Sequence, residues 1–301
     1  MTKELNIMHQ LAPSELILTN QRVYHLGLHP DDLAELIITV GDPDRVKMVS
    51  KHFDCVEIQI KNREFETHTG YIGKKRLSVI STGIGTDNID IVLNELDALV
   101  NIDLDNRVYK RIRKVLSIVR IGTSGSIHSS ANIDDFLVSI DALGLDGLMH
   151  FYNYQYSDRE QDLRNNLLAY LSGEQIVLPT EPYMVSSSDK LIRQLKNDNF
   201  KKGITLTAPG FYAPQGRILN GKTKFSKETI QKMTQFNFRG LNLTNIEMET
   251  AGIYGLANYL GHHAISFNAI LANRWEGNFS SNPSQTIENL IKKVLALMVA
   301  E

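Results

Sequence analysis

Val115-Leu116-Ser117-Ile118-Val119-Arg120-Ile121-Gly122-Thr123-Ser124-Gly125 is the stretch of this sequence that decides the fold. Its first seven positions are mostly apolar, as expected of a strand that helices cover on both faces of a sheet. We therefore predict a strand over Val115–Ile121, followed by a glycine-rich turn. Arg120 interrupts this run, and a buried charge costs free energy unless it meets an opposite charge. It indicates either a structural salt bridge or a bound anion.

Similar apolar runs recur on both sides of this stretch. We predict strands over Leu36–Val40, Leu77–Ser81, Val115–Ile121, Phe136–Ile140, Ile204–Ala208 and Ala264–Ala272. Helical patterns lie between and after them. We predict helices that begin at Asp42-Pro43 and at Asn282-Pro283, and helices over Asn88–Val100, Ser188–Lys196 and Glu249–Leu260. This alternation is typical of an α/β domain with a mainly parallel or mixed sheet.

The composition excludes several classes of protein. The chain has 301 residues, and its 32 Lys and Arg nearly balance 34 Asp and Glu, which suggests neither a nucleic-acid nor a membrane partner. No apolar run reaches the roughly 18 residues that a membrane span needs. Residues 1–18 lack the apolar core of a secretory signal. With Cys55 as the single cysteine, we expect a cytoplasmic protein in a reducing compartment.

Three further features have structural interpretations. Cys55 lies in an alternating apolar stretch, and we expect a core or sheet position for it. The nine histidines show no metal-ligand spacing, and we predict no zinc site. The basic stretch Asn101–Lys114 could bind an anion, but a solvated helix face or loop is the favoured interpretation.

Glycines and arginines follow four of the predicted strands. The segments are Gly41-Asp42-Pro43-Asp44-Arg45, Thr82-Gly83-Ile84-Gly85, Gly122-Thr123-Ser124-Gly125 and Asn273-Arg274. Ligands of open α/β sheets bind beyond the carboxyl ends of the strands. Glycine turns, helix starts and guanidinium groups all favour anions. The sequence therefore predicts an anion site there, although it contains neither a P-loop nor a dinucleotide-binding motif.

Two carboxylates, Glu247 and Glu249, stand two residues apart before a helix rich in small residues. Acidic residues in a first helical turn stabilise the helix dipole. Helix-dipole stabilisation explains either glutamate by itself. It does not explain why two glutamates flank Met248.

Six segments match one family in order and spacing: His25-Leu26-Gly27-Leu28, Gly41-Asp42-Pro43-Asp44-Arg45, Arg63-Glu64-Phe65, Ser81-Thr82-Gly83-Ile84-Gly85, Arg120-Ile121-Gly122-Thr123-Ser124-Gly125 and Glu247-Met248-Glu249. From about Val23 to the last helix, the chain resembles the phosphate-dependent nucleoside phosphorylases of the uridine and purine type. The resemblance implies a single α/β domain over 1–301, built on a distorted, partly barrel-like mixed sheet. Residues 1–22 would be an N-terminal extension and 101–114 an insertion.

The resemblance also implies residue roles. Gly41, Arg45, Arg120 and Thr123 would hold phosphate. Arg63 would reach the same phosphate from a second subunit, and His25 would likewise cross over to the ribose 5′-hydroxyl. Met248 and Glu249 would hold the ribose. The implied assembly is a homo-oligomer built from dimers with shared active sites.

Base choice depends on two further segments. Phe211, Gln215 and Arg217 resemble the uridine-type signature, with Phe211 stacking on the base and the other two hydrogen-bonding to uracil. Leu271 and Ala272 would line the base pocket, and Arg274 would support the loop above it. Purine-specific members of the hexameric bacterial kind typically carry Asp where Asn273 stands, and Asn cannot deliver the proton that this Asp gives to the purine ring.

The resemblance thus predicts phosphorolysis of a pyrimidine nucleoside: uridine and phosphate give uracil and ribose 1-phosphate. Arg120, Glu249, Gln215 and Arg217 would be the catalytic residues. Phosphate is the co-substrate and no other cofactor is needed. Some members bind a monovalent cation such as K⁺ between subunits, at positions that are Glu64, Ile84 and Asn88 here.

Three other functions remain open at this point. They are a purine nucleoside phosphorylase, a hydrolytic nucleosidase on the same fold, and a non-catalytic nucleoside-binding protein. Two segments depart from the family pattern, Asn101–Lys114 and Trp275–Phe279. The choice between dimer and hexamer, and that among uridine, deoxyuridine and thymidine, therefore stays open.

Overall fold

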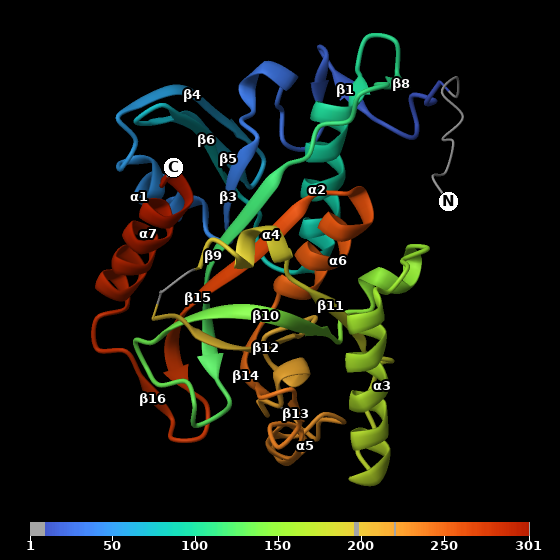
Figure 1. Cartoon of the computed structure of the whole chain (residues 1–301), viewed down its shortest axis with the longest axis vertical. Coiled ribbons are helices and arrows are strands. Elements are labelled where there is room, and N and C mark those ends of the chain that lie inside the picture. Colours follow the sequence, from blue (N-terminus) through green and yellow to red (C-terminus); the bar gives the residue numbers. More distant parts are fainter. Residues whose placement is uncertain (1–9, 196–198, 220, 301) are drawn as a thin grey trace.

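The computed structural model describes residues 10–195, 199–219 and 221–300. They fold around one mixed sheet of 12 strands with helices on its faces (Figure 1). The main path of the sheet runs through β13 (Asn237–Phe238), β14 (Leu241–Glu247), β12 (Lys201–Thr207), β10 (Phe136–Gly144), β15 (His263–Asn273), β9 (Ser117–Ser126), β3 (Leu36–Val40), β6 (Lys75–Ser81), β5 (Phe65–Ile72) and β4 (Cys55–Asn62). Two short strands join it at the side, β11 (Tyr183–Ser186) on β10 and β16 (Asn278–Phe279) on β15.

Part of this sheet closes on itself. The end of β14 pairs with the end of β9, where Asn245 faces Ser126 and Ile246 faces Gly125. Together with the remaining pairings, this contact joins β9, β15, β10, β12 and β14 into a ring. The expected single α/β fold with a distorted, partly barrel-like mixed sheet is confirmed.

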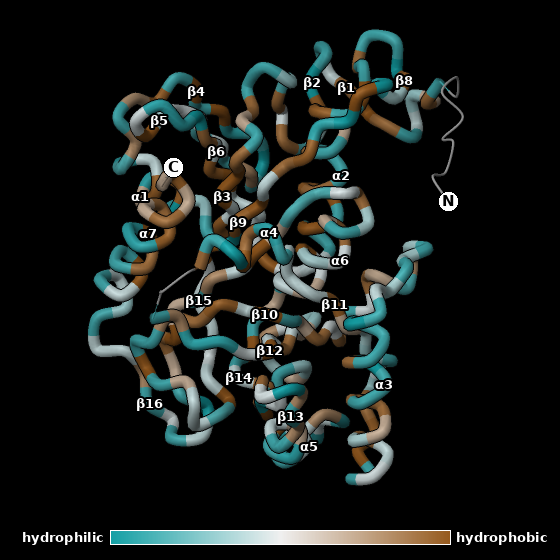
Figure 2. Tube along the Cα trace, viewed as in Figure 1, coloured by the Kyte–Doolittle hydropathy of each residue, from teal (hydrophilic) through white to brown (hydrophobic). Residues whose placement is uncertain are grey.

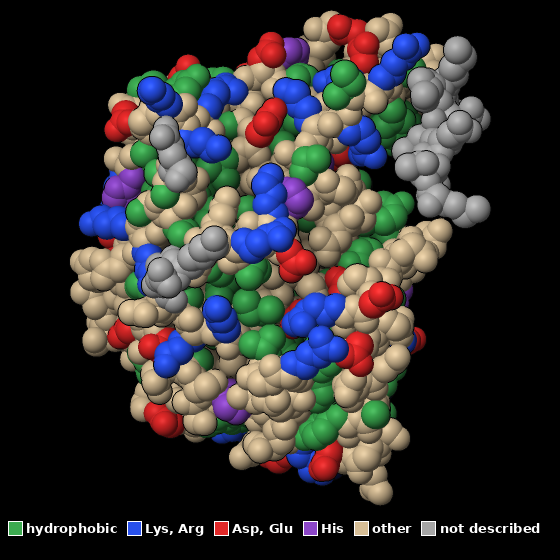
Figure 3. All heavy atoms as spheres, viewed as in Figure 1, with side chains coloured by type: hydrophobic (Ala, Val, Ile, Leu, Met, Phe, Trp, Pro, Cys, Tyr) green, Lys and Arg blue, Asp and Glu red, His purple; other side chains and the backbone are tan. Residues whose placement is uncertain are grey.

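The helices bury three separate apolar clusters. Helices α2 (Thr86–Asn101) and α6 (Thr250–Leu260) contribute to one, and α1 (Pro43–Ser50) and α7 (Pro283–Val299) to a second. Helices α3 (Asp158–Gly173) and α5 (Lys227–Met233) contribute to a third, against the closed part of the sheet. The apolar residues concentrate on the central strands and on the helix faces toward them (Figure 2). On the surface in Figure 3, basic and acidic side chains both occur.

Smaller elements complete the described chain. They are the hairpins β1 (Leu18–Thr19)–β2 (Arg22–Val23) and β7 (Ile102–Asp103)–β8 (Val108–Tyr109), the short helix α4 (Asp189–Ile192), and the 3₁₀ turns η1 (Pro30–Asp32), η2 (Leu148–Phe151) and η3 (Ala213–Gln215). Among the residues described, no helix is long and apolar enough to cross a membrane.

The predicted strands all form, but only Leu36–Val40 has the predicted bounds, and two strands continue well beyond theirs. Strand β9 begins at Ser117, leaving Val115 partly exposed, and it continues to Ser126 through the predicted glycine turn. The reason is that β15 and β14 supply backbone partners for this extension. Strand β10 likewise continues past Ile140, because β11 and β12 pair with it there.

The predicted helices also form, and one of them is much shorter than predicted. Helix α1 begins at Pro43, and the Asp42 side chain accepts a hydrogen bond from the Asp44 N–H, as its cap. The helix predicted over 188–196 ends at Ile192, and Lys196 lies outside the described residues. Helices α3 and α5 were not predicted. The apolar residues that helix α3 buries are Leu163, Leu167 and Leu171, four residues apart, so its buried apolar stripe is narrow.

The basic stretch Asn101–Lys114 forms the β7–β8 hairpin and an extended segment, so the loop interpretation holds and the helical one is wrong. Its charges meet partners within the chain: Arg113 lies 3.1 Å from Asp97 and Lys114 lies 3.3 Å from Glu35. Cys55 belongs to β4, as expected of a sheet residue, but it is exposed because this strand forms the outer edge of the sheet.

Candidate active site

A cavity of about 800 Å³ opens where β3, β6 and β9 end. These three strands are parallel neighbours, so the segments that follow them meet at one edge of the sheet. The end of β14, the start of α6 and the end of β15 complete the wall. The residues predicted for phosphate, ribose and base that line it are Gly41, Arg45, Arg120, Thr123, Phe211, Gln215, Arg217, Met248, Glu249, Leu271 and Ala272.

His25 and Arg63 do not line this cavity, and they lie next to each other instead. Arg63 donates a hydrogen bond from Nη2 to the Tyr24 hydroxyl at 3.0 Å. The Tyr24 ring packs edge-on against the His25 ring, with 5.0 Å between centroids. The two residues that the family resemblance assigns to a second subunit's site thus share one surface.

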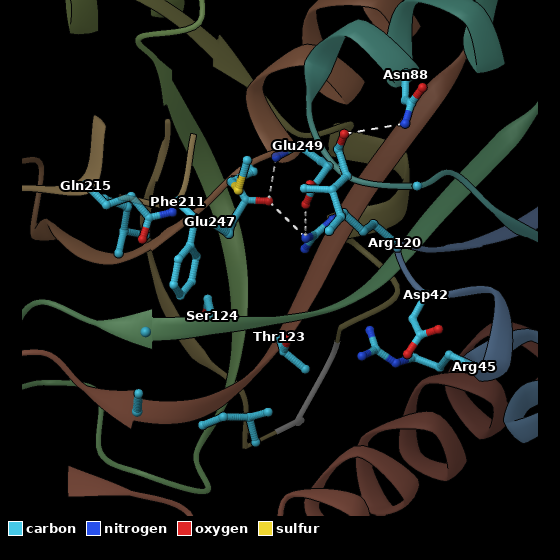
Figure 4. A pocket seen from close by; sticks show the side chains of 18 of the residues that line it. Asp42, Arg45, Asn88, Arg120, Thr123, Ser124, Phe211, Gln215, Glu247 and Glu249 are labelled. Atoms are coloured by element: carbon cyan, nitrogen blue, oxygen red, sulfur yellow. Dashed lines mark hydrogen bonds and ion pairs between the residues drawn. The ribbon is translucent and has the colours of Figure 1, made fainter. Parts of the chain in front are cut away.

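Arg120 occupies the middle of the cavity wall and is bound on two sides (Figure 4). Its Nη2 lies 2.6 Å from Glu249 Oε2 and 3.0 Å from Glu247 Oε2, and its Nη1 donates to Asn268 Oδ1 at 2.9 Å. Burial disfavours the charge, but the two carboxylates outweigh burial and raise the pKa of Arg120. The salt-bridge interpretation of this residue is confirmed, and an anion would have to share the guanidinium with these carboxylates.

The two acidic residues have different surroundings. Glu247 accepts hydrogen bonds from the Glu249 and Thr250 N–H groups, both at 3.0 Å, and from the Thr207 hydroxyl at 2.7 Å. It therefore satisfies the start of α6 as well as Arg120. Glu249 accepts from the Gly85 N–H at 2.8 Å. Burial raises the pKa of Glu249, and Arg120 opposes that shift. Glu249 accepts fewer backbone hydrogen bonds than Glu247. It would therefore lose less if its carboxylate moved to bind a ligand.

Arg45 differs from Arg120 in having no direct partner among the residues that the structure describes. No described residue forms a hydrogen bond or ion pair with its guanidinium, although the side chain lines the cavity. Burial and the positive charge of Arg120 lower the pKa of Arg45, and Asp42 and Glu249 partly offset this. A cation in this position is ready to bind an oxyanion.

The opposite side of the cavity is aromatic and amide-bearing (Figure 4). The Arg217 guanidinium carbon lies 4.0 Å from the centroid of the Phe211 ring, and its Nε donates to the Phe211 carbonyl at 3.0 Å. Arg274 donates from Nη1 to Gln215 Oε1 at 3.2 Å and from Nη2 to the Gln215 carbonyl at 2.8 Å. With Oε1 engaged by this cation, Gln215 keeps its Nε2 donor for a ligand.

Several lining residues had no individual role in the sequence-based prediction: Ile246 and Phe279, and also Asp42, Pro43, Ser124 and Glu247, which were noted only as parts of motifs. Phe279 is 73% exposed and pairs across β15–β16 with Ala272, a predicted base-pocket residue. The position of Phe279 beside Ala272 would follow from the register of the β15–β16 hairpin. The sequence shows no turn signal strong enough to fix that register. Asn273 does not line the cavity, because its Oδ1 accepts from the Trp275 and Glu276 N–H groups of the turn.

The predicted cation positions Glu64, Ile84 and Asn88 also line the cavity. Asn88 Nδ2 lies 3.4 Å from the Ile84 carbonyl oxygen. Among the described residues, no cluster of three or more His, Cys, Asp or Glu side chains could hold a metal ion.

Comparisons with known proteins agree with this geometry. The family model described as the phosphorylase superfamily matches residues 35–300. Uridine phosphorylase of Thermococcus kodakarensis is 29% identical over 258 residues, which cover 85% of this chain and 79% of that protein. Uridine phosphorylase of Haemophilus influenzae is 26% identical over 281 residues, covering 92% and 96%. A Trypanosoma brucei nucleoside phosphorylase, whose crystal structure is described as showing uridine phosphorylase activity, superimposes with a TM-score of 0.82 at 26% identity, covering 95% and 100%.

Proposed function

The chain belongs to the phosphorylase superfamily, and we propose that it is a pentosyltransferase that cleaves uridine with inorganic phosphate, giving uracil and ribose 1-phosphate. One observation carries this proposal: the Arg45 guanidinium, which pairs with no described residue, faces a cavity that also holds Arg120, Glu249 and an amide-and-aromatic wall. An oxyanion, a sugar and a planar base are the ligands that these three groups of residues suit.

The reaction follows from the order of these groups along the cavity. A phosphate oxygen held by Arg45, Arg120 and Thr123 bonds to C1′ as the C1′–N1 bond breaks. Glu249 fixes the ribose hydroxyls, so that the reacting atoms are held in line. The electron pair of the broken bond stays on uracil, which then takes up a proton. Gln215 and Arg217 donate to the developing negative charge on the base.

The base preference rests on the resemblance of Phe211, Gln215 and Arg217 to the uridine-type signature, and the geometry of Gln215 is compatible with it. Its Oε1 is engaged by Arg274, so its Nε2 is a fixed donor. A pyrimidine carbonyl accepts from such a donor. The family resemblance at Asn273 supports the same choice, since Asn cannot deliver the proton that a purine requires and Glu276, the carboxylic acid of that turn, does not line the cavity. A purine nucleoside phosphorylase is the alternative that the assay below must reject.

Two details extend this proposal. We place the enzyme in the cytoplasm as a homo-oligomer of dimers, in which Arg63 and His25 of each subunit complete the other's site. A monovalent cation such as K⁺ would suit Glu64, the Ile84 carbonyl and the Asn88 amide, because all three offer oxygen ligands. Its charge would stabilise the subunit contact and the nearby phosphate.

The test is a substrate panel with and without phosphate. We expect uracil to be released from uridine only when phosphate is present, as followed by absorbance. Release without phosphate would identify a hydrolase, and faster turnover of inosine would identify a purine enzyme. Binding of uridine without any release of base would identify a non-catalytic protein.

A further inference from the structure

Glu95 is a buried carboxylate in the middle of α2, outside the cavity and unused in the mechanism above. It accepts from the N–H of His25 at 3.0 Å and from the N–H of Leu26 at 2.8 Å. Its Oε1 also lies 2.7 Å from Nδ1 of the His25 ring. A helix side chain thus makes three contacts with a loop about 70 residues earlier in the sequence.

The same loop is held from its other side. The Asn62 amide donates to the carbonyls of Tyr24 and His25, at 3.0 and 2.8 Å. Gly27 has a φ of +67°, and a Cβ there would lie 3.0 Å from the Cβ of Asn62. Leu26 itself is buried in the core beside α2. The backbone at His25 is therefore fixed, and only the ring remains to be oriented.

Glu95 fixes the ring as well. An ionised carboxylate only accepts hydrogen bonds, so Nδ1 of His25 must carry the proton. In the neutral ring, Nε2 then has a free lone pair. No hydrogen bond from a described residue reaches Nε2, and the His25 side chain is 31% exposed. The result is an acceptor held at fixed orientation on the surface that also carries Arg63.

We propose that Glu95 is a positioning residue for the 5′-hydroxyl of the nucleoside. It sets the tautomer and the orientation of His25, so that Nε2 accepts a hydrogen bond from that hydroxyl in the site of a second subunit. This inference rests on the proposed function, in which His25 completes the neighbouring site. It adds a residue that touches no substrate yet determines how the ribose is recognised.

The experiment compares uridine with 5′-deoxyuridine, which lacks only the 5′-hydroxyl. We expect the wild-type enzyme to prefer uridine in kcat/KM by about tenfold, the worth of one hydrogen bond. Glu95→Gln should remove most of this preference by raising KM for uridine. Its kcat/KM for 5′-deoxyuridine should change less than about twofold, because that substrate never used the contact.

Two further variants separate positioning from a general structural effect. His25→Ala should lose the same preference, and adding Glu95→Gln to it should cost nothing more, because both changes remove one interaction. Asp90→Asn is the matched control, since Asp90 is a carboxylate on the same helix that pairs with Tyr152 rather than His25. It should keep the preference for uridine.

Equal losses on both substrates in Glu95→Gln would overturn the proposal. So would an absence of any wild-type preference, although uridine phosphorolysis itself would then still stand. If the variant does not fold, ¹⁵N spectra of histidine-labelled wild-type protein decide the matter. Neutral His25 should carry its proton on Nδ1, and a proton on Nε2 would contradict the inference even if no substrate were turned over.

Discussion

Arg45 and Arg120 line the same cavity, but they differ in what they already bind. Arg120 neutralises Glu247 and Glu249 inside the protein, whereas no described residue pairs with Arg45. Removing Arg120 would leave two buried carboxylates uncompensated, which typically costs about 3–5 kcal/mol of stability. Arg45 is therefore a better target than Arg120 for a test of phosphate binding.

Arg45→Ala should lower kcat/KM for phosphate by about 100-fold, as when a preorganised charged donor is lost from an active site. The free energy of unfolding should stay the same or rise, because the substitution removes a desolvated cation that pairs with no residue of the described chain. Steady-state kinetics with varied phosphate, together with urea denaturation, measure both quantities. An unchanged KM and kcat for phosphate would show that the anion does not bind at Arg45. Arg120→Ala serves as the comparison, with activity and stability both reduced.

At the scale of elements, some helices are stabilised by local sequence signals and lie outside the active site, so their stability can be changed without changing activity. Helix α3 is the clearest case, since none of its residues lines the cavity. It begins with a capping box: the Ser157 hydroxyl accepts from the Glu160 N–H, and Glu160 Oε2 accepts from the Ser157 N–H at 2.9 Å. This pair is readable in the sequence as Ser followed by Glu three residues later.

Ser157→Ala should lower the free energy of unfolding by about 1 kcal/mol, because one N–H of the first helical turn loses its acceptor. Phosphorolysis should be unaffected. The matched control is Ser172→Ala, an exposed serine near the other end of the same helix. Urea denaturation of both variants measures the effect. Equal midpoints for the two would mean that the cap does not stabilise α3.

At the scale of the whole molecule, closure of the sheet assembles the site. The β14–β9 contact brings Glu247, at the end of β14, within 3.0 Å of Arg120 on β9. The same fold leaves His25 and Arg63 on a different surface from the cavity. One subunit therefore holds most of the predicted site but lacks two of its members.

Shared sites predict complementation between inactive variants. Arg45→Ala damages a subunit's own site, and Arg63→Ala damages the site of its neighbour. After subunit exchange in an equal mixture, about a quarter of all sites should be intact, because half the dimers are mixed and each has one native site. Activity should therefore exceed that of either variant alone. A mixture no more active than the mean of the two variants would mean that Arg63 does not complete the site of a neighbouring subunit.

The sequence by itself determined the elements whose signals are local. Strands such as Leu36–Val40, the Asp42-Pro43 helix start and the glycine-flanked arginines could be read from composition and spacing, and the family motifs predicted which residues meet in one pocket. Helix α3 and the β7–β8 hairpin were not predicted, because their apolar patterns are too weak to define a face. The capping box of α3 marks where a helix would begin, but without an apolar stripe it does not by itself predict one.

Only the tertiary structure decided which charges pair. The sequence left Arg120 open between a salt bridge and an anion, and it said nothing of Arg274 gripping the Gln215 amide or of Glu95 holding His25. The physical reason is that periodicity reports which side chains are buried. The partners of a buried polar group depend instead on strand order, register and closure between segments far apart in the chain.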